Sequence, residues 1–518
     1  IPIYAQIWPK VYLQNYGTTP WSVIEHYDKG YFIGGRYISS TGSPINGLII
    51  KTNINGDILW HKAFGKTNDG SGIFDIDNTH DGGVILAGTT HEYDSWGDPF
   101  IMKLNPCGES EWCRIYTVGE NRFDRVESIV QIPGGYIALV LFGGEVEYND
   151  RIRLYRLDNN GDLMWQQIYG RLDTLMDESE AEDMMVTPDY QYLIIGWCYY
   201  PDSGIVWPKS LRPLLVKVDS AGSLDWEIPW DEIHDSSYLG MAYRSIVDNN
   251  QTIYSCGRHI EIEEGETPPG DRPTMMKTSS GGNEISYHDL VPDSWQAVFF
   301  NLNWFRDSTI EIDGGWVTPQ NEKQIAVFKV DRNGNILDSA NIMKTDYCFS
   351  DAIVDHDNKV FLVQGLYSYN QWRSYSWKLN SDLEPDSLYT RPMVYDSLCP
   401  HPIVSDTIPL DCVVVGLDEP LKNPETGQLK VYPNPAGDIL HIEIPSMIKT
   451  VTPIPSYDVT TVYHRWDKAT LEIYDLFGKK LYSTIVTQNQ PPIGLNVSAW
   501  ETGMYLIRLV YNGQTADS

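Results

Sequence analysis

The stretch Leu157-Asp158-Asn159-Asn160-Gly161-Asp162-Leu163-Met164-Trp165 decides the fold, because versions of it return along most of the chain. Each version follows an apolar run that ends in a basic residue. The spacing between successive copies varies only from 49 to 61 residues, and a period near 50 indicates one supersecondary unit per repeat. Seven copies align on the basic residue, which is Lys51, Lys103, Arg156, Lys217, Lys277, Lys329 or Lys378.

Each repeat contains about four short β-rich runs separated by Gly, Asn and Asp turns. A four-stranded unit repeated seven times predicts a seven-bladed β-propeller, a ring of small twisted sheets with short, protected edges. The Gly of each repeated turn supplies the positive φ that a tight hairpin needs. The Trp or apolar residue four positions later is placed to pack between neighbouring blades. The runs of one repeat are Ile73–Asn78, Val84–Thr89, Phe100–Leu104 and Glu111–Tyr116.

Closure of the ring is predicted from an orphan strand at the start of the chain. Ile7–Tyr12 resembles Leu59–Phe64, the strand after a repeated turn, but no turn precedes it. We expect it to pair with the last blade near Ser374–Leu379. Leu383–Tyr389 could fill the same place, so both alternatives stay open.

Length and composition exclude several classes of protein. The 518 residues are too many for one ordinary core, so two units are expected. With 42% hydrophobic residues, 33 Tyr and 17 Trp, the chain has the composition of a packed, strand-rich protein. No stretch approaches the ~20 apolar residues of a membrane span. The net charge of −32 repels phosphate backbones, so we expect no nucleic-acid partner.

The domain order follows from where the repeats begin and stop. Residues 1–6 resemble the tail of a secretory signal peptide, with a small residue at Ala5. Residues 7–395 are predicted to form the propeller and residues 396–422 a Pro-rich linker. Residues 423–518 alternate in strand fashion with no trace of the repeat, and we expect them to form a small Ig-like β-sandwich. The fold class is therefore all-β.

Seven cysteines fit an exported protein loosely, because an odd number leaves one unpaired. Two local pairs are candidates for disulfides. Cys399 and Cys412 enclose a Pro-rich stretch, and Cys107 and Cys113 flank one repeated turn. The remaining three are interpreted as core thiols, since none has zinc-site spacing: Cys198, Cys256 and Cys348.

Three motifs near the C-terminus carry a family resemblance. They are Val431–Asp438 (VYPNPAGD), Leu471–Leu481 (LEIYDLFGKKL) and Leu495–Arg508 (LNVSAWETGMYLIR). In this order they resemble the type A C-terminal sorting domain of the type IX (Por) secretion system of Bacteroidetes. The resemblance implies a folded address read by the outer-membrane translocon and its sorting machinery, and a protein that is secreted or held at the outer-membrane surface. The motif residues are Pro433, Asn434, Pro435, Gly437, Asp438, Tyr474, Asp475, Gly478, Gly503 and Tyr505.

No catalytic or metal-binding pattern stands out from the repeats. The Trp follows the turn Gly by four residues, whereas in the Asp box of sialidases it follows by three. Asp158, Asn160 and Asp162 lack the closing Glu of a calcium loop, as do Asp75, Asp77 and Asp81, so they are interpreted as turn formers. We therefore predict no cofactor, no metal and no catalytic residue.

The clearest single-copy departure from the repeat is the insertion Gly196–Pro208, which is rich in aromatic residues. Aromatic rings on a loop can stack on sugars or anchor a protein partner. The alternative is an insertion folded over its own blade. The candidate ligand-binding residues are Trp197, Tyr199, Tyr200 and Trp207.

Two functions remain open from the sequence. The first is an exported, non-enzymatic binding or adhesion propeller with a protein or glycan ligand, favoured by the regular repeat and the lack of a catalytic signature. The second is a secreted carbohydrate-active hydrolase or lyase with carboxylates at the mouth of the propeller channel, favoured by analogy with other secreted propellers.

Overall fold

The computed structural model consists of strands and connecting turns and divides into two compact units, Ile1–Asp418 and Glu419–Ser518. The predicted signal-peptide remnant at residues 1–6 lies outside the described residues. The structure describes residues 8–14, 16–38, 45–65, 70–92, 96–117, 124–142, 151–169, 179–199, 211–230, 239–261, 270–291, 296–317, 322–344, 348–368, 371–416, 430–432, 439–443, 448–452, 460–464, 468–475, 479–487, 493–498, 500, 505–511 and 514–517.

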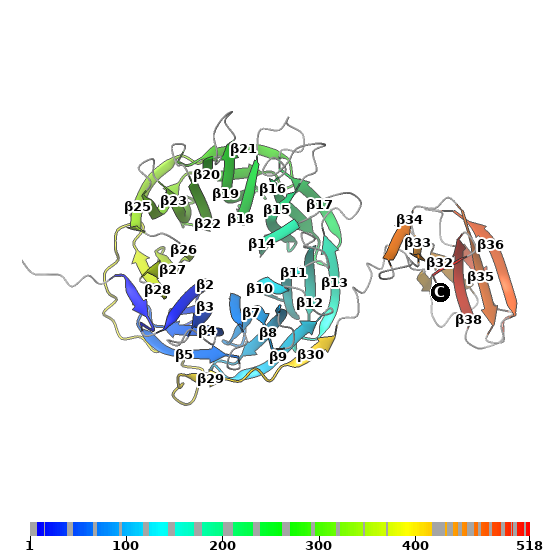
Figure 1. The fold of residues 1–518 in the computed structure, drawn as a ribbon, viewed down its shortest axis with the longest axis horizontal. Coiled ribbons are helices and arrows are strands. Elements are labelled where there is room, and N and C mark those ends of the chain that lie inside the picture. Colours follow the sequence, from blue (N-terminus) through cyan, green and yellow to red (C-terminus); the bar gives the residue numbers. More distant parts are fainter. Residues whose placement is uncertain are drawn as a thin grey trace, which may run out of the picture. The chain divides into compact units, whose positions relative to one another are not determined.

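The first unit contains, among its described residues, seven sheets that resemble the blades of a propeller and stand in a ring (Figure 1). The first strand of each sheet faces the centre of the ring. Sheets 1 to 3 contain β2 (Gly17–Glu25), β3 (Tyr31–Ile38), β4 (Ile45–Thr52) and β5 (Ile58–Phe64); β6 (Gly72–Asn78), β7 (Val84–Thr90), β8 (Asp98–Leu104) and β9 (Ser110–Thr117); and β10 (Arg125–Ile132), β11 (Gly135–Phe142), β12 (Arg151–Leu157) and β13 (Leu163–Tyr169).

The remaining four sheets repeat this antiparallel order. Sheets 4 and 5 contain β14 (Ser179–Val186), β15 (Tyr192–Tyr199), β16 (Leu211–Val218) and β17 (Leu224–Pro229); and β18 (Leu239–Val247), β19 (Ile253–Glu261), β20 (Gly270–Thr278) and β21 (Glu284–Asp289). Sheets 6 and 7 contain β22 (Gln296–Trp304), β23 (Ile310–Val317), β24 (Lys323–Val330) and β25 (Ile336–Lys344); and β26 (Cys348–Val354), β27 (Val360–Ser368), β28 (Gln371–Leu379) and β1 (Lys10–Tyr12).

The N-terminal strand closes the ring, as the sequence predicted. β1 pairs antiparallel with β28, with Val11 opposite Tyr375, and so supplies the outer strand of sheet 7. Tyr12, the last residue of β1, and Trp8, two residues before the strand, are both buried. The competing segment at residues 383–389 makes one isolated bridge, between Leu379 and Pro385, and does not replace β1.

The repeated turns are built as the sequence predicted. Oδ1 of Asp158 accepts hydrogen bonds from the backbone N–H groups of Asn160 (2.8 Å) and Asp162 (2.9 Å), and Gly161 has a φ of 78°. The ring of Trp112, from the preceding sheet, lies against Gly161, where a Cβ atom would come within 2.6 Å of it. Glycine is therefore required both for the turn and for the packing between sheets.

The basic residue of five of the seven repeats has a role that the sequence pattern did not reveal. Lys51 reaches back to Asp28, in the turn before the second strand of its own sheet, at 2.7 Å, and both side chains are buried. Burial raises the pKa of Asp28, but the charge of Lys51 and the hydrogen bonds from Lys51 and from backbone N–H groups together outweigh it, and the pKa lies below its ordinary value. The same pairing recurs in Lys103–Asp81, Lys217–Asp189, Lys329–Asp307 and Lys378–Asp355.

Residues 396–416, which we name the strap, correct the predicted linker at 396–422. The strap lies along the outside of sheets 1 and 2 and belongs to the first unit as far as Asp418. It adds two short parallel strands, β29 (Asp406–Ile408) to β5 and β30 (Val413–Gly416) to β9. Its Leu410 is 3% exposed and joins the core of these sheets. In a free linker the side chain of Leu410 and the backbone groups of β29 and β30 would be exposed to water.

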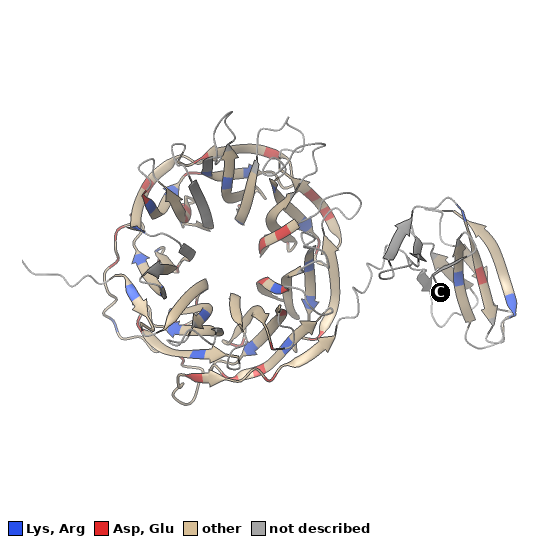
Figure 2. Cartoon of the chain, in the orientation of Figure 1, with Lys and Arg blue, Asp and Glu red and all other residues tan. Residues whose placement is uncertain are grey.

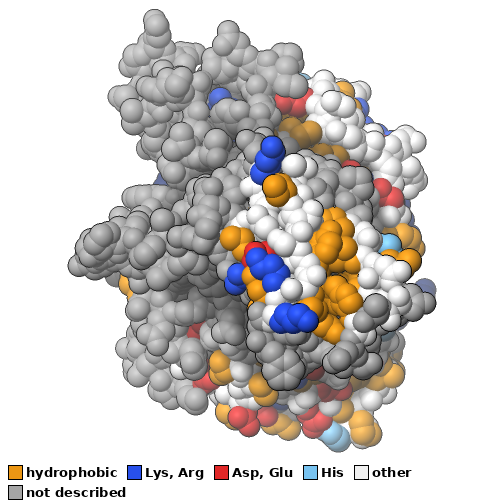
Figure 3. Space-filling model, turned by 90° about the vertical axis from the view of Figure 1, so that its right-hand side faces the viewer, with side chains coloured by type: hydrophobic (Ala, Val, Ile, Leu, Met, Phe, Trp, Pro, Cys, Tyr) orange, Lys and Arg blue, Asp and Glu red, His pale blue; other side chains and the backbone are white. Residues whose placement is uncertain are grey.

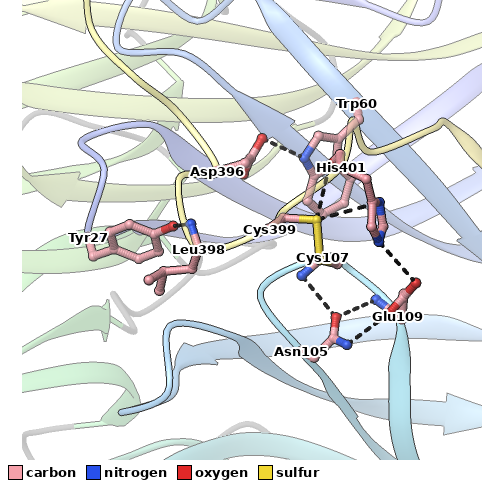
Figure 4. The surroundings of a disulfide bond; sticks show 9 residues. All are labelled: Tyr27, Trp60, Asn105, Cys107, Glu109, Asp396, Leu398, Cys399 and His401. Carbon is pink, nitrogen blue, oxygen red and sulfur yellow. Dashed lines mark hydrogen bonds and ion pairs between the residues drawn. A yellow bond between two sulfur atoms is a disulfide. The ribbon is translucent and has the colours of Figure 1, made fainter.

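Two disulfides fasten the strap, and their pairing differs from the prediction. The four cysteines are those expected, but Cys107 bonds Cys399 and Cys113 bonds Cys412, with Cα atoms 4.9 and 4.5 Å apart. The local pairs fail because the strap runs across two sheets, so each of its cysteines meets a different cysteine of sheet 2. Figure 4 shows the first disulfide, with His401 of the strap beside Glu109.

The second unit is described by itself. Its sheets have the strand orders β31-β32-β37, β33-β34 and β36-β35-β38-β39. One core joins the first and third sheets, with Leu440, Ile442, Leu471, Ile473 and Leu509 packed together. The strands are β31 (Lys430–Tyr432), β32 (Ile439–Glu443), β33 (Ile448–Thr452), β34 (Thr460–His464), β35 (Ala469–Asp475), β36 (Lys480–Val486), β37 (Ile493–Asn496), β38 (Tyr505–Tyr511) and β39 (Gln514–Asp517).

Candidate functional site

The inner strands place one polar residue each at the same position of the repeat. In sheets 1 to 6 this residue follows a β-bulge, which bends the inner strand and re-aims its side chains. We call these residues the polar ring. Its members are Ser22, Asp75, Ser128, Asp183, Arg244, Asn301 and Asp351.

Arg244 is the centre of the polar ring. Its guanidinium lies 3.2 Å from Asp183 Oδ2 of sheet 4 and donates to Asn301 Oδ1 of sheet 6 at 2.8 Å. It also donates to Asp351 Oδ1 of sheet 7 at 2.7 Å. One side chain of sheet 5 therefore links four of the seven sheets at the inner face of the ring. Its own side chain remains 29% exposed, whereas that of Asp351 is 4% exposed.

Backbone N–H groups also donate hydrogen bonds to two carboxylates of the polar ring, Asp351 and Asp75. The N–H of Val23 donates to Asp351 Oδ2 at 2.6 Å, and the N–H of Ile129 donates to Asp75 Oδ2 at 2.8 Å. Burial lowers the pKa of Arg244, but Asp351 and Asp183 raise it above its ordinary value. The cluster is thus a closed network of charge-assisted hydrogen bonds.

Asp75 is an acid of the polar ring whose pKa is strongly raised. Burial raises the pKa of Asp75 to about 7, against the hydrogen bond from Ile129, and the charge of Asp183 adds to the rise. Its Oδ1 accepts a hydrogen bond from Ser22 Oγ at 3.0 Å. Near neutral pH this carboxyl therefore exchanges a proton at the inner face of the ring.

A second acidic group occupies the bulges of sheets 3 and 4, where Figure 2 marks acidic positions in red on the ribbon of the inner strands β10 and β14. Glu127 is the bulge residue of β10 and Glu182 that of β14. Arg125 donates through Nε to Glu127. Burial raises the pKa of Glu127 to about 7, against the charge of Arg125, and the charge of Glu182 adds to the rise.

The structure corrects one of the four candidate ligand-binding residues, Trp197. Trp197 lies in strand β15, is 6% exposed and donates through Nε1 to Glu182 Oε1 at 3.1 Å. Its ring is buried against Leu211 and Ile260, so no face is open to a ligand. Tyr199 ends the same strand, and its side chain lies outside the described residues, as do Tyr200 and Trp207. Strand β15 pairs with β16 for three residues past Gly196, as far as Tyr199, so the first part of the predicted insertion is a strand.

The described residues of the sorting motif gather on one sheet of the second unit. Tyr474 donates to Glu472 Oε2 at 2.8 Å, and Arg508 donates to both Glu472 Oε2 (2.9 Å) and the Tyr474 hydroxyl (2.9 Å). Lys480 donates to Glu472 as well, and its hydrogen bond is the main cause that lowers the pKa of Glu472 to about 2. Tyr505 is half-buried, packed against Trp500.

The other motif residues fall outside the described residues or show only their backbone. Asp475 ends β35. Exposed apolar residues flank the charged group, with Ile485 69% and Leu506 48% exposed. Figure 3 shows hydrophobic side chains beside Lys and Arg on one face of the molecule. The sorting-motif residues that lie outside the described residues are Pro433, Asn434, Pro435, Gly437, Asp438, Gly478 and Gly503.

Potential metal ligands gather at one place among the described residues. One set of three donors comes together, Cys107, Cys399 and His401, but the two sulfur atoms are bonded to each other in a disulfide. A disulfide offers no thiolate to a metal. Asp158 and Asp81, two of the candidate calcium ligands, accept hydrogen bonds in turns, as where Asp81 Oδ1 accepts from the N–H of Gly83 at 3.0 Å. Asp75 and Asp77 lie in strand β6 instead, which corrects their interpretation as turn formers.

Comparison with known families identifies the second unit. Residues 430–517 match the family model of the secretion system C-terminal sorting domain. The protein is therefore an exported all-β protein that carries this sorting domain and is secreted or located at the cell surface. No curated protein sequence matches the chain. Within the described residues no helix has the length and apolar character needed to cross a membrane.

Several solved structures match the chain at low sequence identity. A protein of unknown function from Dyadobacter fermentans is 10% identical, with a TM-score of 0.40, over 73% of this chain and 99% of its own. An ulvan lyase of a polysaccharide lyase family is 8% identical, with a TM-score of 0.46, over 71% and 95%. An endo-arabinase from Bacteroides thetaiotaomicron is 9% identical, with a TM-score of 0.29, over 49% and 90%. Such distant similarity assigns no activity.

Proposed function

We propose that the protein is an exported binding or adhesion module of a Bacteroidetes bacterium. In this proposal the first unit is a seven-bladed β-propeller that binds an extracellular protein or glycan. The second is an Ig-like β-sandwich that the type IX translocon and its sorting machinery read. The observation that carries the proposal is the sorting domain at residues 430–517, attached to a ring of regular sheets.

The state of the inner carboxylates supports binding over catalysis. A pair of carboxyl groups for acid and base chemistry must be available to the substrate. Asp183 and Asp351 are both engaged by Arg244, and Asp351 also accepts a backbone hydrogen bond. These two acids therefore join sheets together and are not free to exchange protons with a bound ligand.

The test uses residues 8–418, which include the strap. A glycan and peptide array probed with this fragment should give reproducible hits, and incubation with those hits should leave them chemically unchanged. Product analysis by mass spectrometry checks the second point. Failure to bind any probe on either array would contradict the binding function, and turnover of a hit would favour the enzyme.

The alternative, a carbohydrate-active hydrolase or lyase, has one observation in its favour. Glu127 combines a pKa of about 7 with a second carboxyl, Glu182, at the equivalent position of the next sheet. A raised pKa keeps a carboxylic acid protonated near neutral pH, as a general acid requires. If array hits are cleaved, Glu127→Gln should abolish cleavage and leave binding intact, whereas Asp75→Asn should spare cleavage.

A further inference from the structure

A pocket lies between the strap and sheet 1, outside every site described above. Its volume is about 250 Å³. This lies below the roughly 300–1,000 Å³ of pockets for drug-sized ligands, so the pocket fits one small ring. The residues that line it are Leu13, Tyr16, Tyr37, Leu48, His61, Ala63, Ser405, Asp406 and Thr407.

The pocket has one apolar wall and one polar wall. Leu48 and Ala63 are buried and form the floor on the sheet side, and Tyr16 and Tyr37 stand edge to face with centroids 5.9 Å apart. Tyr16 keeps 41% of its surface exposed, so its ring offers a face to a ligand. The opposite wall is the strap segment Ser405–Thr407, which supplies hydroxyl, carboxylate and backbone groups.

The charges at the pocket nearly cancel. Asp406 is paired with Lys62 at 2.6 Å. Burial lowers the pKa of His61, against the charge of Asp406, so its imidazole is neutral at pH 7 and offers one donor and one acceptor. A neutral ligand with one apolar face and several hydroxyl groups matches these walls better than an ion does.

The polar wall exists because the strap is held in place. β29 pairs in parallel with β5, with Asp406 opposite Lys62, and the N–H of His61 donates to Ser405 Oγ at 3.1 Å. The disulfides at Cys399 and Cys412 fasten the strap on either side of this segment. The pocket is thus a preorganised site, whose walls are set before a ligand arrives.

We propose that this pocket binds a single neutral sugar ring, stacked on Tyr16 and hydrogen-bonded by the strap and His61. The proposal rests on the binding function proposed above and names the ligand class and the site. The sugar is one residue of a glycan, because the pocket opens to solvent and has room for one ring. Binding energy comes from the aromatic face and from the polar groups that fix orientation.

The test is saturation-transfer NMR on residues 8–418 with the methyl glycosides of glucose, galactose, mannose and N-acetylglucosamine. At least one should bind, with a dissociation constant of about 1 mM. Tyr16→Ala should weaken it roughly tenfold or more, while Tyr16→Phe, which keeps the ring, should retain most of the affinity. Tyr190→Ala, at a tyrosine 74% exposed on sheet 4, is the matched control and should bind normally.

The outcomes separate the two proposals. Melting curves of the variants verify that each is folded. Normal sugar binding by folded Tyr16→Ala overturns the pocket and leaves the binding function standing. Array hits without any monosaccharide binding also overturn the pocket, because they place the ligand elsewhere. Absence of binding in every assay overturns both.

Discussion

At the scale of single residues, Arg244 does more than the repeated residues to join the sheets. Six polar side chains occupy its equivalent positions, and it is the one cation among these seven. Its contacts to Asp183, Asn301 and Asp351 come from three sheets other than its own. Removing one partner of such a network leaves desolvated charges without compensation.

Arg244→Met should therefore destabilise the first unit strongly, by about 3 kcal/mol, because Asp183 and Asp351 lose their counter-ion. Urea denaturation of residues 8–418 measures the loss. Lys344→Met is the control: it removes an exposed ion pair with Glu322, whose side chains are 66% and 48% exposed, and should cost less than about 1 kcal/mol. Equal effects of the two substitutions would contradict the linking role.

Asp75 should make stability depend on pH. Its pKa of about 7 in the folded protein lies above the ordinary 3.8, so the folded state binds the proton more tightly than the unfolded state does. Its stabilising contribution is present below about pH 4 and is lost as pH rises to about 7. Asp75→Asn cannot titrate, so the melting temperature of the variant minus that of the wild type should increase from pH 4 to 7. A constant difference across this range would be inconsistent with the raised pKa.

The repeat predicted the packing of Trp112 on Gly161, because the Gly recurs in six of the seven copies and the Trp in four. It did not predict Arg244, because a residue that occurs once looks like ordinary variation on a strand. Alignment of the inner strands on their bulges would have shown a charged residue among small and acidic ones. Trp197 was misassigned for the opposite reason: its aromatic neighbours suggested a loop, whereas strand pairing continues to Tyr199.

At the scale of elements, the strap could not be predicted from local sequence. β29 and β30 are three and four residues long, and their parallel partners β5 and β9 lie 344 and 299 residues earlier (Asp406 to Lys62, Val413 to Arg114). Pro and Asp residues are typical of linkers, so composition favoured the wrong interpretation. Closure by β1, in contrast, was predictable, because its sequence copies a strand of the repeat.

The disulfide pairing provides a direct test of the strap. Glu109 and Glu111 lie between Cys107 and Cys113, and Asp406 and Asp411 lie between Cys399 and Cys412. Digestion of the unreduced protein with trypsin and a protease that cuts at acidic residues separates all four cysteines. Mass spectrometry should then find the cross-linked peptides 107–399 and 113–412. Peptides linked 107–113 or 399–412 would show that the strap is not fastened to sheet 2.

At the scale of the whole molecule, the boundary between the units lies after the strap. The first unit includes both the strand that closes sheet 7 and the strap that covers sheets 1 and 2. The second has its own core around Leu471 and Leu509. Each unit should therefore fold by itself when the chain is cut at Asp418.

Truncation tests this boundary. A chain that ends at Asp418 should keep the melting temperature of the first unit, because the sorting domain contributes no strand to it. A chain that ends at Tyr395 loses the buried Leu410 and both disulfides, and should melt markedly lower; disulfides that close long loops contribute about 2–5 kcal/mol each. Equal melting temperatures of the two truncated chains would show that residues 396–418 are a linker.

The overlap of the two chain ends has a mechanical consequence. The first strand of the chain belongs to the last sheet, and the last segment of the ring is bonded covalently to the second sheet. A pull applied to the chain beyond Asp418 enters the ring at sheet 2, first through β30, which pairs with β9, and then through the disulfide between Cys412 and Cys113. It does not enter at β1, whose three-residue ladder with β28 joins the N-terminal strand to sheet 7. If tension on the sorting domain separates β30 from β9, the next link that it loads is a covalent bond.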